Sequence, residues 1–159
     1  MKFRKLGQSD LNCSVIGLGT WGMAGSFWGK VDDDQSIATI RAGLEAGINL
    51  IDTAPVYGDG HSEEVVGRAL EGLKREDIVL ATKCGRFTCE TEKIRQELET
   101  SLKRLKTDYI DLYQVHWPDD KVPFEETFGE LENMRKQGKI RYIGVSNFSV
   151  EQTEEASKY

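Results

Sequence analysis

Five polar residues in this sequence stand at or just behind the ends of apolar runs that are typical of buried strands. They are Asp52, Lys83, His116, Ser146 and Asn147. The carboxyl ends of parallel strands meet on one face of a sheet or barrel, and such folds place their active sites there. A carboxylate, an ammonium and an imidazole can together hold and move protons. Any one of these residues alone fits a cap, a solvated strand end or a core group, but the set favours an active site.

A glycine pattern near the amino terminus, G-L-G-T-W-G at residues 17–22, satisfies the dinucleotide fingerprint G-x-G-x-x-G. That fingerprint requires a helix opening directly at the motif, because the helix amino terminus holds the pyrophosphate. Residues 23–29 continue instead as a loop of glycine and aromatic residues. The pattern therefore does not by itself predict a Rossmann-type site.

The cysteines and histidines do not predict a metal site. Cys13, Cys84 and Cys89 cannot all pair within one chain, and their sparse use fits a reducing compartment. Cys84 and Cys89 have a loose zinc spacing, but the only histidines are His61 and His116, and neither forms a short cluster with a cysteine. We assign His61 no role, and a redox-sensitive Cys84 has no support from the sequence.

The elements that must position the polar residues alternate along the chain. After a hairpin at residues 2–14, the predicted strands cover 15–18, 48–51, 78–81, 109–113 and 140–145. The predicted helices cover 34–46, a segment capped by Ser62, a segment with Ile94, Leu98, Leu102 and Leu105 on one face, a segment from Pro123 to Gly138, and 150–158. Such strands and crossover helices, spaced about 30 residues apart, indicate an α/β fold with parallel pairing.

Two architectures fit this alternation over a single domain of residues 1–159. One is an open doubly wound sheet of five strands, and the other is about half of a (β/α)₈ barrel, which usually needs about 250 residues. Periodicity alone does not choose between them.

Composition excludes several classes of protein. With 38% hydrophobic and 30% charged residues, the chain is globular and is neither disordered nor collagen-like. A net charge of −6 gives no basic field for nucleic acid or an anionic membrane. No stretch approaches the ~18 consecutive apolar residues of a spanning helix, so we expect a cytoplasmic protein.

Four segments together resemble the aldo-keto reductases. They are I-D-T-A-P-V-Y-G at 51–58, A-T-K at 81–83, V-H-W at 115–117 and G-V-S-N-F at 144–148, in the family's order and spacing. Residues 17–21 also match the family's first loop. The run G-D-G-H-S-E at 58–63 is similar to the microbial branch that resembles voltage-gated potassium-channel β subunits.

The resemblance implies a (β/α)₈ TIM-type barrel that binds NADP(H), with NAD(H) as the alternative. It implies a catalytic tetrad of Asp52, Tyr57, Lys83 and His116. The implied cofactor contacts are Gly19, Thr20, Trp21, Asp52, Ser146 and Asn147. The substrate pocket would be lined by Trp21, Trp28, Tyr57, His116 and Trp117, although aromatic residues are as often plain core.

The chemistry of these residue types supports the implied tetrad. A phenol has an unperturbed pKa of about 10, and a neighbouring ammonium makes proton transfer from it easier. Lys83 would act on Tyr57 in this way, with Asp52 holding the lysine charged and oriented. Tyr57 and His116 would then donate hydrogen bonds to a substrate carbonyl oxygen as hydride arrives from the cofactor, with Tyr57 as general acid.

The sequence departs from the family in its extent. Members continue through three more strand–helix units and a terminal loop, which carry most contacts to the cofactor's adenosine and pyrophosphate. The segment between Cys84 and Glu92 is also short. We therefore expect a partial barrel of about five βα units, with an open edge that favours self-association. Two functions remain: reduction of a small carbonyl substrate, or a catalytically incomplete module that acts in interaction or redox sensing.

Overall fold

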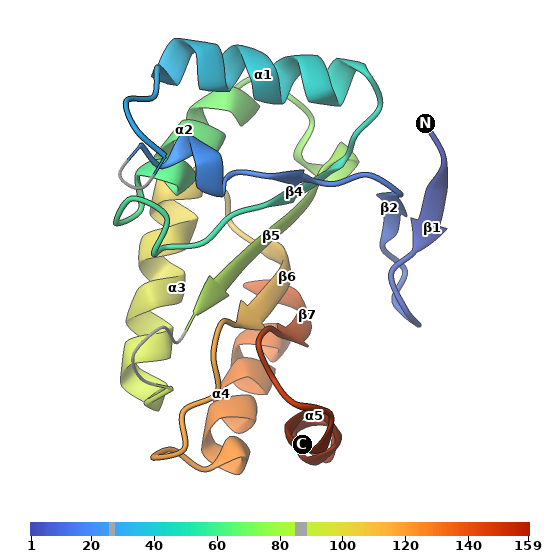
Figure 1. The fold of residues 1–159 in the computed structure, drawn as a ribbon. Helices are drawn as coiled ribbons and strands as arrows, with labels where there is room; N and C mark the ends of the chain where they lie inside the picture. Colours follow the sequence, from blue (N-terminus) through green and yellow to red (C-terminus); the bar gives the residue numbers. More distant parts are fainter. Residues whose placement is uncertain (26–27, 85–88) are drawn as a thin grey trace.

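The protein is described by a computed structural model over residues 1–25, 28–84 and 89–159, and its centre is a parallel sheet (Figure 1). The sheet has the order β3-β4-β5-β6-β7. Its strands are β3 (Leu18–Gly19), β4 (Leu50–Asp52), β5 (Val79–Cys84), β6 (Ile110–Val115) and β7 (Ile140–Val145). Each strand pairs in parallel with the next one in the sequence, and Ile51 faces Leu80 in the register.

Helices connect these strands and follow one another around the outer side of the curled sheet (Figure 1). They are η1 (Trp21–Met23), α1 (Asp33–Glu45), α2 (His61–Leu70), η2 (Arg75–Asp77), α3 (Thr91–Leu105), α4 (Phe124–Lys136) and α5 (Val150–Ala156). A sequential parallel order with the crossover helices outside is the pattern of a partial (β/α)₈ barrel, as the resemblance implied. It is not the order of a doubly wound sheet, which reverses direction.

The core lies between these helices and the outward side of the strands. In α3, the predicted stripe of Ile94, Leu98, Leu102 and Leu105 is buried. The contact of α2 with α3 depends on Gly67, because a Cβ atom there would overlap the carbonyl oxygen of Arg104. Phe148, after β7, stacks on Phe124 of α4 with ring centroids 5.4 Å apart.

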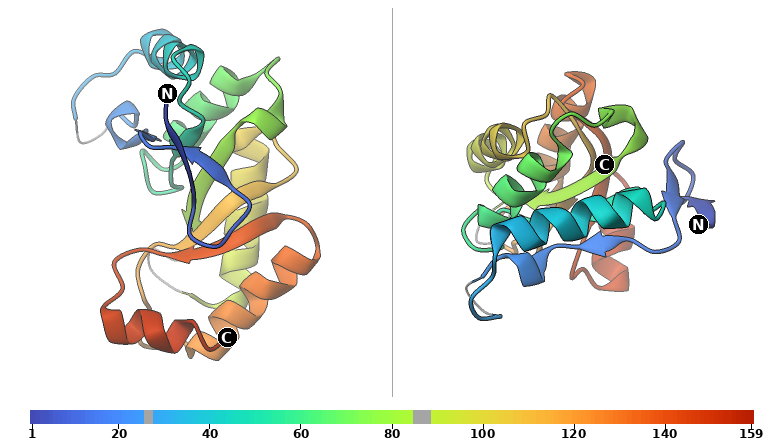
Figure 2. Two further views of the ribbon diagram at one scale, coloured as in Figure 1. Left: turned by 90° about the vertical axis from the view of Figure 1, so that its right-hand side faces the viewer. Right: turned by 90° about the horizontal axis from the view of Figure 1, so that it is seen from above.

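The amino ends of the strands are covered by the predicted hairpin, formed by β1 (Phe3–Lys5) and β2 (Asn12–Ser14). The left view of Figure 2, taken from this side, shows the hairpin in front of the strands. It is joined to β7 by Arg141, whose Nη2 donates to Asp10 Oδ1 at 2.8 Å. The Tyr142 hydroxyl lies 3.1 Å from the same oxygen.

A buried carboxylate lies beneath the hairpin. Asp111 on β6 is 1% exposed, and its Oδ2 accepts from Arg75 Nη2 at 2.7 Å and from the Leu80 amide at 3.0 Å. Its Oδ1 accepts from Arg141 Nη1 at 2.7 Å. Nothing in the sequence analysis singled out this residue, which sits inside an apolar strand pattern.

Two predictions about local structure were wrong. The first strand does not cover residues 15–18 but only Leu18–Gly19, and Val15 and Ile16 are exposed. Ser62 does not cap α2, because Gly60 with φ 96° occupies that position. The Ser62 hydroxyl is instead fully buried beside Thr20.

Parts of two predicted loops lie outside the described residues. These are positions 26–27 of the glycine and aromatic loop, and 85–88 of the short segment before α3. Among the residues that are described, no helix has both the length and the apolar character needed to cross a membrane.

Candidate active site

Lys83 lies at the centre of the polar group at the carboxyl ends of the strands. β5 carries it there, and its side chain is only 7% exposed. Its Nζ lies 2.9 and 2.8 Å from the two carboxylate oxygens of Asp52 and 2.9 Å from the Thr53 carbonyl oxygen. A buried ammonium needs such acceptors, and here the acceptors come from the neighbouring strand β4 and the residue after it.

Tyr57 completes the surroundings of this ammonium. Its hydroxyl is 3.4 Å from Lys83 Nζ, which also lies 5.1 Å from the centre of the Tyr57 ring. The sequence placed Asp52 and Lys83 at strand ends, but Tyr57 comes from the loop after β4. The structure therefore brings three of the four implied tetrad residues into direct polar contact.

His116 is the fourth residue, and it follows β6. Its ring is 6.0 Å from that of Tyr57 in an edge-to-face arrangement, and it stacks on Trp117 at 3.6 Å. The backbone amide of His116 donates to the carbonyl of Cys84 at 2.8 Å, and this bond anchors His116 beside the carboxyl end of β5. Only 5% of His116 is exposed, so its ring is packed within the protein and not surrounded by solvent.

Gln114 is a site residue that the sequence analysis missed. Its Nε2 lies 3.3 Å from Asp52 Oδ1. A strand directs every second side chain to the same face, so Gln114 could have been found as the residue two positions before His116.

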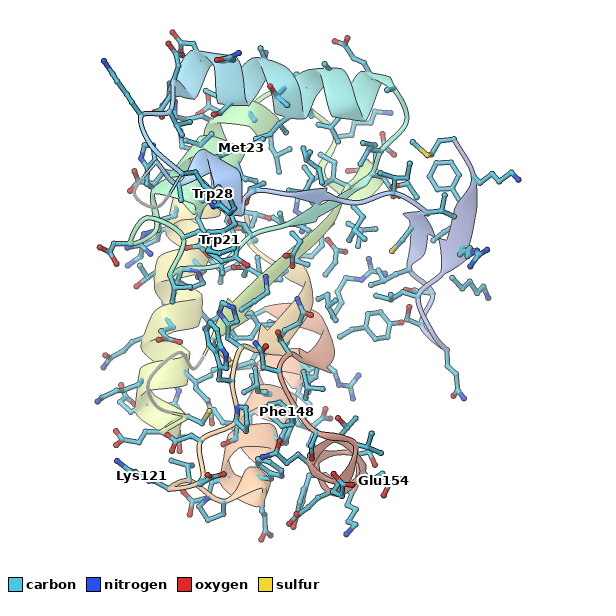
Figure 3. The ribbon with its side chains drawn as sticks, in the orientation of Figure 1. Trp21, Met23, Trp28, Lys121, Phe148 and Glu154 are labelled. Carbon is cyan, nitrogen blue, oxygen red and sulfur yellow. The ribbon has the colours of Figure 1, made fainter. Side chains whose placement is uncertain are left out.

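The predicted aromatic wall is present at the same edge. Trp21 lies 5.1 Å from Trp28 and 6.2 Å from Tyr57 between ring centroids, and Figure 3 shows the two tryptophans together beside the end of β3. All three tryptophans are more than one third exposed. They are thus placed beside the tetrad, and their contact with a substrate stays a prediction.

The implied nicotinamide contacts follow β7. Asn147 adopts φ 59°, and its Nδ2 donates to the His116 carbonyl at 2.8 Å and lies 3.1 Å from Ser146 Oγ. This places a hydroxyl and a side-chain amide next to the tetrad. Such a donor and acceptor set fits the carboxamide of a nicotinamide ring. Gly19 on β3 has open space where a Cβ atom would be, so a flat ring can approach its backbone.

Thr20, one of the cofactor contacts that the resemblance implied, lies in a buried group of hydroxyl side chains. It is fully buried, and its Oγ1 lies 3.1 Å from the Asp52 carbonyl and 2.7 Å from Ser62 Oγ. Ser62 Oγ is also 3.2 Å from Thr53 Oγ1. These hydrogen bonds connect the loop after β3 to β4, the strand that carries Asp52. Sequence spacing did not indicate this role. A cofactor contact of Thr20 stays a prediction.

The thiols near the site are not activated. Burial raises the pKa of Cys84 well above its ordinary value, and the acidic Glu97 adds to this effect. Burial also raises the pKa of Cys89 to about 11. Since the thiolate is the reactive form, neither group has the electrostatics of a redox sensor. In the described part of the chain, no three metal-ligating side chains gather in one place.

A partial (β/α)₈ barrel with Asp, Tyr, Lys and His at the carboxyl ends of its strands defines the class of the aldo-keto reductases. The comparison of the sequence with known families agrees: the chain belongs to the Aldo/keto reductase family, with residues 15–159 matched.

Particular relatives extend this finding. The chain is 50% identical to aldo-keto reductase YhdN of Bacillus subtilis (strain 168), over 96% of this chain and 49% of the relative. It is 40% identical to the NADH-specific methylglyoxal reductase of Escherichia coli (strain K12), over 100% of this chain and 56% of the relative. A crystal structure of an aldo-keto reductase from Klebsiella pneumoniae with NADPH superposes with a TM-score of 0.84 at 39% identity, covering 92% of this chain and 50% of that one. The chain thus spans about half the length of these relatives.

Proposed function

We propose that the chain forms the catalytic part of an NAD(P)H-dependent oxidoreductase that reduces small aldehydes or ketones to alcohols. The observation that carries the proposal is the contact of Lys83 Nζ with both the Asp52 carboxylate and the Tyr57 hydroxyl. NADP(H) is the proposed cofactor and NAD(H) the alternative, since similar proteins are described with either one.

In this proposal, Tyr57 is the general acid. The Lys83 ammonium lies beside the Tyr57 hydroxyl, where its charge stabilises the negative charge that the phenol oxygen gains as it donates its proton to the substrate carbonyl oxygen. Asp52 accepts from Lys83 and orients its ammonium, and Gln114 on β6 lies beside Asp52. His116 donates a second hydrogen bond to the same substrate oxygen and so stabilises the charge that develops there.

The cofactor would lie across the carboxyl end of the sheet. Ser146 and Asn147 would bind the carboxamide of the nicotinamide, and the open backbone at Gly19 would let the ring approach. Bound there, the nicotinamide supplies the hydride. Trp21, Trp28 and Trp117 would enclose an apolar substrate and exclude water from its carbonyl group.

The second candidate is a non-catalytic module of the same fold. The raised pKa values of Cys84 and Cys89 give no support to its redox-sensing form. The three cysteines are free and buried, which is consistent with the reducing, cytoplasmic setting that we propose for the protein.

Titration of the purified chain with NADPH, followed by cofactor fluorescence and by light scattering, tests the proposal. We expect saturable binding and turnover of a carbonyl such as methylglyoxal. In Tyr57→Phe, turnover should fall by about a hundredfold or more while NADPH still binds, because only the acid is lost. Unchanged turnover in this variant would refute the acid role. A folded chain that binds no NADPH would favour the non-catalytic module.

A further inference from the structure

The turn that carries Tyr57 has an unusual backbone. Three consecutive residues after it have positive φ: Gly58 at 64°, Asp59 at 53° and Gly60 at 96°. Glycine adopts this region freely, and aspartate is one of the few other residues that adopt it at a modest steric cost. A Cβ atom on Gly58 would lie 2.5 Å from the Ala24 carbonyl oxygen. The turn is therefore packed closely against the loop that precedes α1.

Arg104, near the end of α3, contacts this turn from outside the active site. Its Nη2 donates to the Asp59 carbonyl at 3.1 Å. Its guanidinium also lies directly against Gly60, since a Cβ atom on that glycine would overlap the group. Arg104 therefore contacts two of the three left-handed residues directly.

Glu63 connects this arginine to the strand of Lys83. Its side chain is fully buried in the first turn of α2, and its Oε2 lies 3.4 Å from Arg104 Nη1. Its Oε1 accepts from Thr82 Oγ1 at 2.7 Å, and Thr82 immediately precedes Lys83 on β5. Burial raises the pKa of Glu63, while the hydrogen bond from Thr82 and the charge of Arg104 oppose the rise.

We propose that Arg104 and Glu63 are positioning residues that hold the turn of Tyr57 against β5, so that the Tyr57 hydroxyl stays beside Lys83. Neither residue touches the reacting atoms. The chain of contacts runs from Thr82 through Glu63 and Arg104 to the Asp59 carbonyl. The catalytic consequence rests on the function proposed above, whereas the effect on Tyr57 itself does not.

α3 offers a matched control in Arg95. Its Nη2 lies 2.9 Å from Oε1 of Glu130, a residue of α4 that is 5% exposed, so it too pairs with a buried glutamate. Its pairs are with Glu130 and with Glu92 of its own helix, and neither acid belongs to the Tyr57 turn. Arg95→Ala thus removes the same kind of ion pair from the same helix.

The first experiment observes Tyr57 without any turnover. The chain has five tyrosines, and labelling them with 3-fluorotyrosine gives fluorine NMR lines from which Tyr57→Phe identifies the line of Tyr57. We expect Arg95→Ala to leave this line where it is in the wild type, and Arg104→Ala to shift or broaden it. Arg104→Lys serves if the alanine variant does not fold, because lysine keeps the charge but lacks the planar fork that reaches Asp59. An unchanged Tyr57 line in a folded Arg104 variant overturns the proposal.

The second experiment separates positioning from general stability by kinetics. Arg104→Lys should lower kcat for carbonyl reduction by about tenfold to a hundredfold, because a small displacement of a catalytic group is costly. KM and NADPH affinity should stay within about twofold, and Arg95→Ala should match the wild type. Added guanidinium ion should restore part of the rate of Arg104→Ala.

The outcomes of the two experiments are distinguishable. If the wild type shows no turnover, the proposed function is contradicted. If the Tyr57 line nevertheless moves in the Arg104 variants, the proposal that Arg104 positions the Tyr57 turn is supported. A wild-type kcat in Arg104→Lys, in a chain that does turn over, overturns the positioning role.

Discussion

Two acidic residues at opposite ends of the sheet are both paired with basic groups, yet their surroundings differ. At the amino end, Asp111 is 1% exposed and lies between Arg75 and Arg141, with both oxygens taken by donors. At the carboxyl end, Asp52 is 39% exposed, and its partner Lys83 lies within reach of the Tyr57 hydroxyl. The first cluster is closed by the hairpin, and the second is bordered by three partly exposed tryptophans.

This difference indicates that ion pairs in one fold can either stabilise the structure or prepare a group for chemistry. Both oxygens of the buried Asp111 accept hydrogen bonds from the protein, so we assign its ion pairs to stabilising the fold. Lys83, in contrast, also lies 3.4 Å from the Tyr57 hydroxyl, the group proposed above as the general acid. We therefore propose different roles for these two ion-paired aspartates, according to the groups that surround each pair.

The largest expected effect on stability is that of Asp111→Asn. This change leaves Arg75 and Arg141 without the buried carboxylate, so we expect a loss of about 3 kcal/mol in the free energy of unfolding. Urea denaturation followed by circular dichroism measures it. A loss below about 1 kcal/mol would mean that water or other acceptors replace the carboxylate, and the contrast between the two ends would be lost.

Lys83→Met tests the other end and should change stability less. Methionine fills a similar volume, and the remaining Asp52 carboxylate can be hydrated, so we expect a change within about 1 kcal/mol in the same urea assay. Carbonyl turnover should nevertheless fall by about a hundredfold or more. A loss of stability as large as that of Asp111→Asn would show that Lys83 also serves mainly to hold the fold.

A third ion cluster lies at the start of α1, where Asp33 pairs with His61 and Arg68. Of the three variants, Asp33→Asn should have the smallest effect on the free energy of unfolding. Burial tends to raise the pKa of Asp33, but hydrogen bonds from His61 and Arg68 outweigh it and lower this pKa below 3.8. A lowered pKa in the folded state stabilises the protein above pH 3.8, and this contribution is lost as the pH falls further. Asp33→Asn should cost a few tenths of a kcal/mol at pH 7.

The pH profile of unfolding checks this last expectation. The wild type should lose more stability than Asp33→Asn as the pH is lowered through the region of the carboxyl pKa. Parallel acid profiles of the two proteins would show that the contacts of Asp33 contribute nothing.

Much of the fold could be predicted because it depends on local patterns. The apolar stripe of Ile94, Leu98, Leu102 and Leu105 predicted the helix α3, and the alternation of strands and helices predicted parallel pairing. The apolar run at 15–18 misled the analysis, since apolar character does not say whether a segment is covered. Ser62 did so too, because its hydroxyl is used by Thr20, which is 42 positions away.

The site was predictable to the extent that strand ends determine it. Asp52, Lys83 and His116 could be placed together from their positions behind strands, and Tyr57 came only from the family resemblance. Asp111, Glu63 and Arg104 were missed, because their partners are distant in the sequence and lie on other elements. A charged residue in a strand or helix pattern does not reveal such partners.

The attachment of the hairpin has a consequence for the order of folding. The parallel strand pairings join residues about 30 positions apart, as between Tyr113 and Ile143, whereas Asp10 and Arg141 are 131 positions apart. Closing a longer loop costs more entropy, so distant contacts tend to form late. During synthesis on the ribosome, β2 of the hairpin can therefore bond to Asn49 early, whereas the contacts of Asp10 with Arg141 and Tyr142 form only after β7 has emerged.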